Sequence, residues 1–147
     1  MPLSRSLAGV SFLLALGGCV ANSSNPVVSV ASASLDDSTA TIVLALANPG
    51  GRDLVLDRID YRLDHGEIGF PVARGDWTGR LDLPAGGRAE LPLVIPFEQP
   101  PIEEGSGRIH LTGELHHVDR TGFLGMRSMD LATTSFRLDA EAKRVAP

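Results

Sequence analysis

The sequence lacks the cysteines needed for disulfide cross-links and an apolar run long enough to span a membrane. It contains one cysteine, Cys19, among 147 residues, so it forms no internal disulfide and its stability must come from a hydrophobic core. The longest apolar run, residues 7–16, is too short to cross a bilayer as a mature helix. Only one lysine is present and the formal net charge is −5, so the chain lacks the basic face expected of a nucleic-acid-binding protein.

The first 18 residues have the pattern of a secretory signal. Arg5 precedes the apolar run, and small residues follow it up to Cys19. The stretch Leu16-Gly17-Gly18-Cys19 resembles the lipobox of bacterial lipoproteins, which implies cleavage before Cys19 and acylation of its sulfur and its new amino group. The alternatives are a plain signal peptide followed by an unrelated cysteine, or a buried helix. Because two or three acyl chains hold a protein firmly where one barely does, the lipobox interpretation predicts a membrane-anchored protein.

The residues after Cys19 place the expected domain close to its membrane. Residues 19–25 are small and polar and form a short tether. Val20 stands where an aspartate would favour retention in the inner membrane of a Gram-negative cell. The pattern therefore resembles the outer-membrane class, with the domain facing the periplasm if the cell has an outer membrane.

From Pro26 onward the apolar residues alternate with a period of two. We expect one domain over residues 26–140, followed by a tail, 141–147, with a weak helical pattern. Seven segments rich in Val, Ile, Leu or Thr are separated by turn residues: 27–35, 40–49, 53–63, 67–75, 87–97, 107–118 and 130–138. Short strands with turns about every ten residues predict an antiparallel β-sandwich of about seven strands, of the immunoglobulin or fibronectin type III kind.

The alternation also predicts which side chains face the core. The inward set is Ile42, Leu44, Leu46, Ile59, Tyr61, Leu63, Leu91, Leu93, Ile95, Ile109, Leu111 and Leu115. The period slips by one residue at Asp57-Arg58, which predicts a β-bulge. Gly66 predicts a tight hairpin turn. Pro71, Pro92 and Pro96 each predict an edge strand or a bulge, because proline cannot donate to a ladder.

The stretch around Asn48-Pro49 adds a resemblance. A strand ending in Asn-Pro, then DLVLDRIDYRL (53–63), a turn with Gly66, GFPVARG (69–75) and LPAGGRAELPLVIP (83–96) resemble the water stress and hypersensitive response (WHy) domain. That domain defines the type 2 late embryogenesis abundant (LEA) proteins, which also occur as exported bacterial proteins. The resemblance covers roughly Ala40 to Phe97, and the usual third residue of its motif, asparagine, is Gly50 here. It implies an all-β fold and a role in dehydration or other stress, on client proteins or membranes, and it does not imply an enzyme.

Few residues point to catalysis or metal binding. His110, Thr112, Glu114 and His116 alternate on one strand face and are expected to point to solvent, whereas His117 falls on the inward parity at the rim. Strand positions two apart lie about 7 Å from each other, so only Glu114 and His116 could share an ion, and we expect no metal site. The serines lie in the tether, the first strand or loops, without a nucleophile elbow, so we expect no catalytic site and no cofactor.

Two apolar segments are candidate contact surfaces. Residues 75–79 are expected to form a loop in which Trp77 either meets a partner or lipid, or covers one open end of the sandwich. Phe123 and Leu124 lie in an apolar hairpin tip between the last two strands, and if exposed this tip is the best contact surface in the chain.

The sequence therefore supports two hypotheses. The first is a lipid-anchored, non-catalytic envelope protein that shields client proteins or membrane during water loss. The second is an accessory lipoprotein that docks on an envelope assembly through a sheet edge or the tip at 121–126. A β-sandwich alone does not choose between them, and the sequence does not indicate an oligomeric state.

Overall fold

A computed structural model describes residues 25–67, 69–99, 107–123 and 126–145. The described residues form eight strands: β1 (Val27–Leu35), β2 (Thr39–Ala47), β3 (Asp53–His65), β4 (Phe70–Leu83), β5 (Arg88–Pro96), β6 (Arg108–Phe123), β7 (Met126–Glu141) and β8 (Lys143–Arg144). None of these residues forms a helix, and accordingly none provides a helical membrane span.

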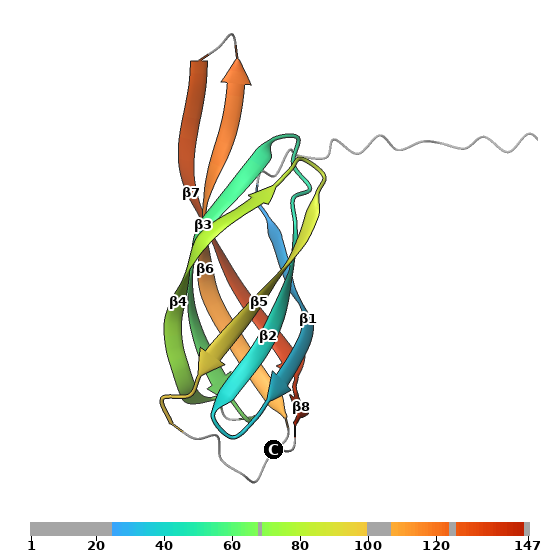
Figure 1. The fold of residues 1–147 in the computed structure, drawn as a ribbon, viewed down its shortest axis with the longest axis vertical. Helices are drawn as coiled ribbons and strands as arrows, with labels where there is room; N and C mark the ends of the chain where they lie inside the picture. The colour runs from blue at the N-terminus through green and yellow to red at the C-terminus, as the bar shows by residue number, and fades with distance from the viewer. Residues whose placement is uncertain (1–24, 68, 100–106, 124–125, 146–147) are drawn as a thin grey trace, which may run out of the picture.

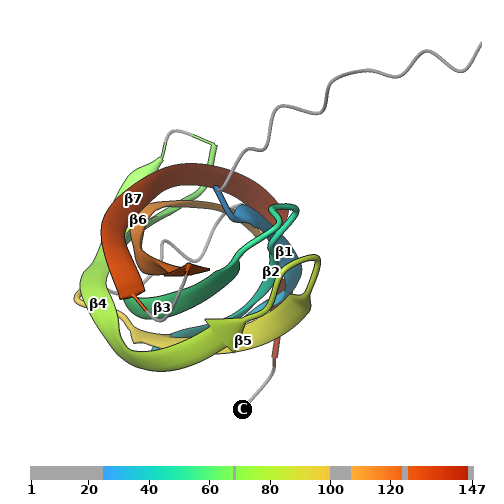
Figure 2. The same cartoon turned by 90° about the horizontal axis from the view of Figure 1, so that it is seen from above.

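The strands form two four-stranded sheets. One sheet has the order β5-β2-β1-β8, hereafter sheet A, and the other has the order β4-β3-β6-β7, hereafter sheet B. All neighbours are antiparallel except β8, which runs parallel to β1. The two sheets face each other and curve around a common interior, with β4 beside β5 and β1 beside β7 (Figures 1 and 2). The predicted antiparallel β-sandwich is confirmed.

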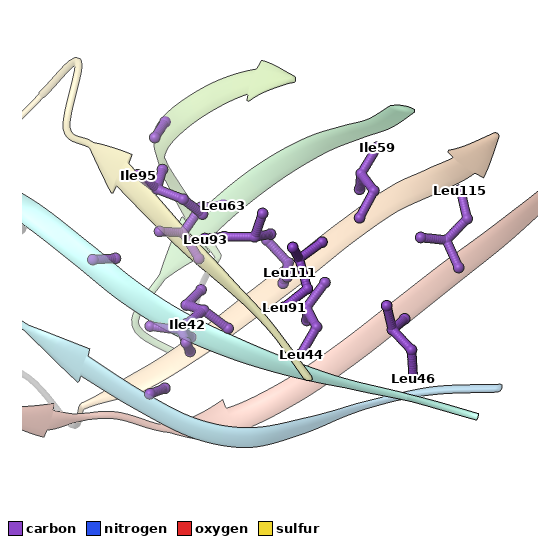
Figure 3. Close-up of a cluster of buried hydrophobic side chains, with 14 of the residues drawn as sticks. Ile42, Leu44, Leu46, Ile59, Leu63, Leu91, Leu93, Ile95, Leu111 and Leu115 are labelled. Carbon is purple, nitrogen blue, oxygen red and sulfur yellow. The ribbon is translucent and has the colours of Figure 1, made fainter. Parts of the chain in front are cut away.

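Leucine and isoleucine side chains fill the space between the sheets (Figure 3). Of the twelve residues predicted to face inward, eleven are buried and Tyr61 is half-buried against the same cluster. The buried set also includes Leu54 and Leu56. These two residues share the inner face of β3 with Ile59 because the register shifts between Leu56 and Arg58, as the alternation predicted.

The turn and edge predictions are also confirmed. Gly66 has a φ of 80° in the turn between β3 and β4. Pro71 lies on β4 and Pro92 on β5, and each of these strands is at the edge of its sheet. A missing amide donor costs least at an edge, where the strand has a free side.

Two expectations about secondary structure are wrong. Residues 75–79 are not a loop but the middle of β4, where Trp77 pairs with Ile59. The weakly helical pattern at the end of the chain instead continues β7 to Glu141 and adds β8, which pairs with Ser34 and Leu35. Backbone pairing to β1 outweighs a local helical preference that no buried face supports.

Glycines make room for aromatic rings in sheet B. Tyr61 pairs with Gly75 on one side and with Gly113 on the other, and Gly113 pairs in turn with Phe136. A Cβ atom on Gly75 would lie 2.8 Å from the Tyr61 hydroxyl, and one on Gly113 would lie 2.6 Å from the Phe136 ring. The row across the sheet therefore alternates glycine and aromatic residues, and both rings extend over their glycine neighbours.

The two ends of the sandwich differ. At one end, β6 and β7 continue beyond the other strands as a two-stranded hairpin, hereafter the arm (residues 120–123 and 126–130) (Figure 1). Arg120 is the last residue of β6 that pairs with β3, and beyond it β6 pairs only with β7. The first residue of β1, Val27, pairs with Ala47 at this same end, whereas β8 lies at the opposite end.

Candidate functional site

Asn48 joins the two sheets at the end that carries the arm. Its side chain is 1% exposed, and its Nδ2 atom lies within hydrogen-bonding distance of three carbonyl oxygens: Arg52 at 2.7 Å, Leu83 at 3.0 Å and Pro84 at 3.2 Å. Asn48 directly follows β2 of sheet A, whereas Leu83 ends β4 of sheet B. The side chain thus supplies donors to carbonyl groups at the end of β4 and in the turns beside it, and buried backbone carbonyl groups require such partners.

The remaining contacts of Asn48 involve only backbone groups. Oδ1 accepts a hydrogen bond of 3.1 Å from the backbone N–H of Gly50, and the Asn48 N–H donates to the carbonyl of Gly87. The contact to position 50 uses only a backbone amide, so it needs no side chain at that position. Pro49 is exposed beside it. The Asn48-Pro49 motif is therefore an architectural joint.

The outer face of sheet B carries a set of short ion pairs. They form between residues two positions apart on one strand, whose side chains lie on the same face. The pairs are Arg58–Asp60 at 2.7 Å, Arg62–Asp64 at 2.8 Å and Arg80–Asp82 at 2.9 Å. Their hydrogen bonds favour the charged forms: the bond from Arg58, supported by His116, holds the pKa of Asp60 below its usual value.

The two outward histidines of β6 each contact a carboxylate on a neighbouring strand. His116 Nε2 lies 2.8 Å from Asp60 Oδ2 on β3, and His110 Nδ1 contacts Asp139 Oδ1 on β7. The contact with His110 lowers the pKa of Asp139. Both histidines are half-buried on the predicted outer face, and His116 pairs with Asp60 instead of Glu114. Within the described ranges, no three His, Cys, Asp or Glu side chains are grouped closely enough to hold a metal ion.

A buried polar pair lies on the inner face near the base of the arm. His117 is 1% exposed and Asp119 is 7% exposed, in agreement with the inward parity predicted for His117. His117 Nε2 contacts Thr134 Oγ1 at 3.0 Å, and Asp119 Oδ2 pairs with Arg52 at 3.3 Å. His117 Nδ1 and Asp119 Oδ1 have no hydrogen-bond partner within the described residues.

Burial of histidine predicts a loss of stability on mild acidification. Burial is the largest factor that lowers the pKa of His117, against the opposing effect of Asp119 and Asp57 and with a further small lowering by His116. Burial, and then Arg144, lower the pKa of His65. The unfolded chain then binds more protons than the folded chain below about pH 6.5, so the stability present at neutral pH falls as the pH falls through that value.

Urea unfolding at pH 7.5 and pH 5.5 tests this prediction. We expect a lower free energy of unfolding at pH 5.5 in the wild type, and a smaller difference between the two pH values in His117→Leu. A stability that is constant or higher at pH 5.5 would contradict it.

The residues singled out from the sequence lie in different places. Trp77 is half-buried on β4, where its indole packs against the core and lies over Gly79. It therefore neither sits in a loop nor covers an open end. The backbone of Phe123 ends β6 in the arm, while Leu124 and Cys19 lie outside the described residues. Asn48 and the base of the arm meet at one end of the sandwich.

Sequence reasoning missed the ion-pair face and the pair of Asp119 with Arg52. The repeated spacing Arg-x-Asp, at residues 58–60, 62–64 and 80–82, was the available signal for the first. The pair of Asp119 with Arg52 joins residues 67 positions apart and depends on the register of β3 against β6, which the sequence does not reveal.

Comparison with known proteins gives fold-level likenesses only. No protein-family profile matches the sequence, and no curated protein is similar to it. Among solved structures, a structural-genomics target is 11% identical with a TM-score of 0.49, covering 83% of this chain and 88% of that one. A protein from Archaeoglobus fulgidus is 9% identical with a TM-score of 0.33, covering 80% and 96%.

A third solved structure also covers most of this chain. It is the solution structure of a protein whose printed name suggests a late embryogenesis abundant (LEA) protein. The two chains are 14% identical with a TM-score of 0.44, and the match covers 85% of this chain and 76% of that one. With identities below 25% and TM-scores below 0.5, these three likenesses establish neither family membership nor a function.

Proposed function

We propose that this protein is a lipid-anchored envelope protein without catalytic activity, which protects client proteins or membrane during water loss. The proposal takes its anchor from the lipobox-like residues 16–19 and its role from the resemblance of residues 40–97 to the WHy domain. The structural observation that carries it is the set of ion pairs on the outer face of sheet B.

Paired charges suit a surface that loses its water. In water an exposed ion pair contributes about 0–1 kcal/mol, because solvent stabilises the separate charges almost as well. Two unit charges 4 Å apart attract by about 1 kcal/mol in water and by about 4 kcal/mol at an effective dielectric constant of 20. As water is removed, each short pair therefore strengthens, and a charge with a partner avoids the cost of an unsolvated one.

His117 and Thr134 do not provide an accessible catalytic pair. His117 and Thr134 form a base and hydroxyl pair at 3.0 Å, an arrangement that could activate a nucleophile. The imidazole, however, lies on the inner face with 1% exposure, so a substrate cannot reach it. The pair acts as a packing contact.

A drying assay tests the proposed role. The chain from residue 23 to 147, which retains every described strand, is dried with a fragile enzyme and compared at equal mass with an inert folded protein of similar charge. We expect a clearly higher recovery of enzyme activity than with the inert protein. Recovery equal to that control would overturn the proposal.

Matched variants link the assay to the ion pairs. Arg58→Gln/Arg62→Gln removes two paired arginines, whereas Arg74→Gln/Arg88→Gln removes two exposed arginines outside the ion pairs described above. Both variants should remain folded in solution, since surface pairs contribute little there. We expect protection to fall in the first variant only, and an equal fall in both would show that net charge matters and pairing does not.

The arm favours a second candidate, an accessory lipoprotein of an envelope assembly. A two-stranded hairpin that extends beyond its sandwich has free edges to which another chain can add a strand (Figure 1). This candidate predicts a fixed protein partner on crosslinking and no protection on drying beyond that of the inert control.

A further inference from the structure

Part of the outer edge of β1 has no strand paired to it. β1 pairs with β2 from Val27 to Leu35, but β8 pairs only with Ser34 and Leu35. Over residues 27–33 the outer edge has no ladder partner among the described residues, and it borders the seam where β1 lies beside β7 (Figure 1). The backbone amide and carbonyl groups that point out of this edge are therefore open to pairing with another strand.

The opposite seam, between β4 and β5, carries residues that hinder such pairing. Proline and charged side chains on an edge strand work against the addition of a further strand. β4 and β5 have both kinds: Pro71, Arg74, Asp76, Arg88, Glu90 and Pro92. Residues 27–33 of β1 contain neither a charged residue nor a proline, and neither do residues 131–136 of β7 across the seam. The β1/β7 seam is therefore the one suited to strand addition.

Exposed apolar side chains lie on the elements that border the β1/β7 seam. Val27 at the start of β1 is 56% exposed, Leu131 on β7 is 82% exposed, and Val145, which follows β8, is 54% exposed. On the inner face of β1, Val28 and Val30 are only half-buried against the core. A strand added to β1 would lie beside these two valines, so it would gain apolar burial as well as backbone hydrogen bonds.

The charge distribution favours a second copy of this chain as the source of the added strand. With a formal net charge of −5, two copies repel each other unless they meet where charges are absent. The outer face of sheet B carries the ion pairs of Arg58, Arg62 and Arg80, whereas the free edge of β1 is uncharged. Two copies that meet through the same edge form a closed dimer instead of a fibre, and each covers the edge that would otherwise favour aggregation.

The sequence of β1 sets the register of this pairing. Residues directly opposite each other in an antiparallel pair lie on the same face of the sheet. A two-fold axis at Ser29 places Val28 of one copy opposite Val30 of the other on the inner face, and the two Ser29 residues opposite each other on the outer face. The ladder ends where Pro26 would meet Ser32, because proline has no amide to donate and β1 is bulged just before Ser32.

We propose that two copies of this protein join through the free edge of β1, antiparallel about a two-fold axis at Ser29. Sheet A then continues from one copy into the other, and β8 leaves room because it covers only Ser34 and Leu35. One short strand pair buries less than the about 1,600 Å² of a standard interface, so the dimer should dissociate on dilution. It requires neither acylation nor a role in drying.

A cysteine at the axis tests this dimer. Residues 23–147 retain every described strand and contain no cysteine, so Ser29→Cys introduces a single thiol. Opposite Cα atoms in an antiparallel pair lie about 4.5–5.5 Å apart, within the range of about 4.4–6.8 Å that disulfides require. With oxidised glutathione we expect the linked dimer to form at least tenfold faster than in Val94→Cys, at an exposed position on β5. Equal rates would overturn the inference.

Sedimentation equilibrium measures the dimer without a cross-link. Residues 23–147 should dimerise as their concentration rises. Ser29→Asp sets two carboxylates against each other at the axis and should raise the dissociation constant at least tenfold, whereas Val94→Asp adds the same charge on β5 and should leave it unchanged. Circular dichroism checks that both variants keep their strands. A monomer at every concentration, or an equal effect of the two variants, would contradict the proposed contact.

An extended segment of an unfolded client protein is the other possible occupant of this edge. Alkylation of the single thiol in Ser29→Cys and in Val94→Cys separates the two occupants. If the pure protein stays monomeric, while a reduced and carboxymethylated unfolded protein slows alkylation of Ser29→Cys only, the edge binds client chains. That result would exclude the dimer and leave the proposed function in place.

Discussion

Replacing Asn48 with alanine will lower the free energy of unfolding by about 3 kcal/mol. The substitution removes the donor shared by the carbonyl groups of Arg52, Leu83 and Pro84, and the acceptor of the Gly50 amide. Each buried polar group left without a partner costs about 1–3 kcal/mol, and partial entry of water will reduce the total. The loss should be large because these bonds join the two sheets.

Urea unfolding followed by tryptophan fluorescence measures this effect. Asn48→Asp is the sharper variant, because it keeps the acceptor for Gly50 but places a carboxylate among carbonyl oxygens, so it should destabilise at least as much at neutral pH. Pro49→Ala, at the exposed neighbour, serves as the control and should change stability little. A free energy of unfolding for Asn48→Ala within about 0.5 kcal/mol of wild type, the range of ordinary surface substitutions, would contradict the role of Asn48 in joining the two sheets.

Gly113→Ala will destabilise the protein by a similar amount, about 3 kcal/mol, or prevent folding. A Cβ atom at this position would lie 2.2 Å from the backbone carbonyl oxygen of Asp60 and 2.6 Å from the ring of Phe136. The ring can shift, but the carbonyl belongs to β3, which is paired on both sides in the middle of sheet B. The clash with the carbonyl can therefore be relieved only by displacing a central strand. The expected loss of stability is then at the upper end of the range for overpacking.

The control for Gly113 is another glycine in an open position. A Cβ atom added to Gly51 would have no other atom within 4 Å, and Gly51 has no positive φ. The free energy of unfolding of Gly51→Ala should therefore be close to that of the wild type. The double variant Gly113→Ala/Phe136→Leu separates the two clashes. We expect it to recover little stability, because the contact with the Asp60 carbonyl remains; full recovery would show that the ring alone was responsible.

The parts of the fold predictable from sequence are those set by one buried face. The alternation in residues 42–46 and 59–63 was sufficient to predict which side chains are buried, because a register shift of one residue would turn each apolar set toward solvent. The bulge at Asp57-Arg58 was visible as a break in that period. Residues 75–79 were misread because glycine and aspartate are typical of loops, whereas Gly75 and Gly79 here lie beneath the rings of Tyr61 and Trp77. The contact of Tyr61 with Gly75 joins two strands, so local sequence does not reveal it.

The candidate site was less predictable because it depends on distant pairings. Asn48 was identified only as part of a turn motif, and its contacts lie 35 and 36 residues away at Leu83 and Pro84. The outward direction of His110 and His116 followed from parity. Their partners Asp139 and Asp60 did not, since they depend on how β6 is aligned with β7 and β3.

The place of β1 between β2 and β8 has a consequence for the time at which the chain can fold. A chain is synthesised from its N-terminus, so Ser34 and Leu35 of β1 gain their pairing with β8 only when the last described strand has been made, and β2 and β3 likewise wait for β5 and β6. Non-local pairings of this kind form slowly and late. The chain therefore reaches its full native strand pairing only when synthesis is nearly complete.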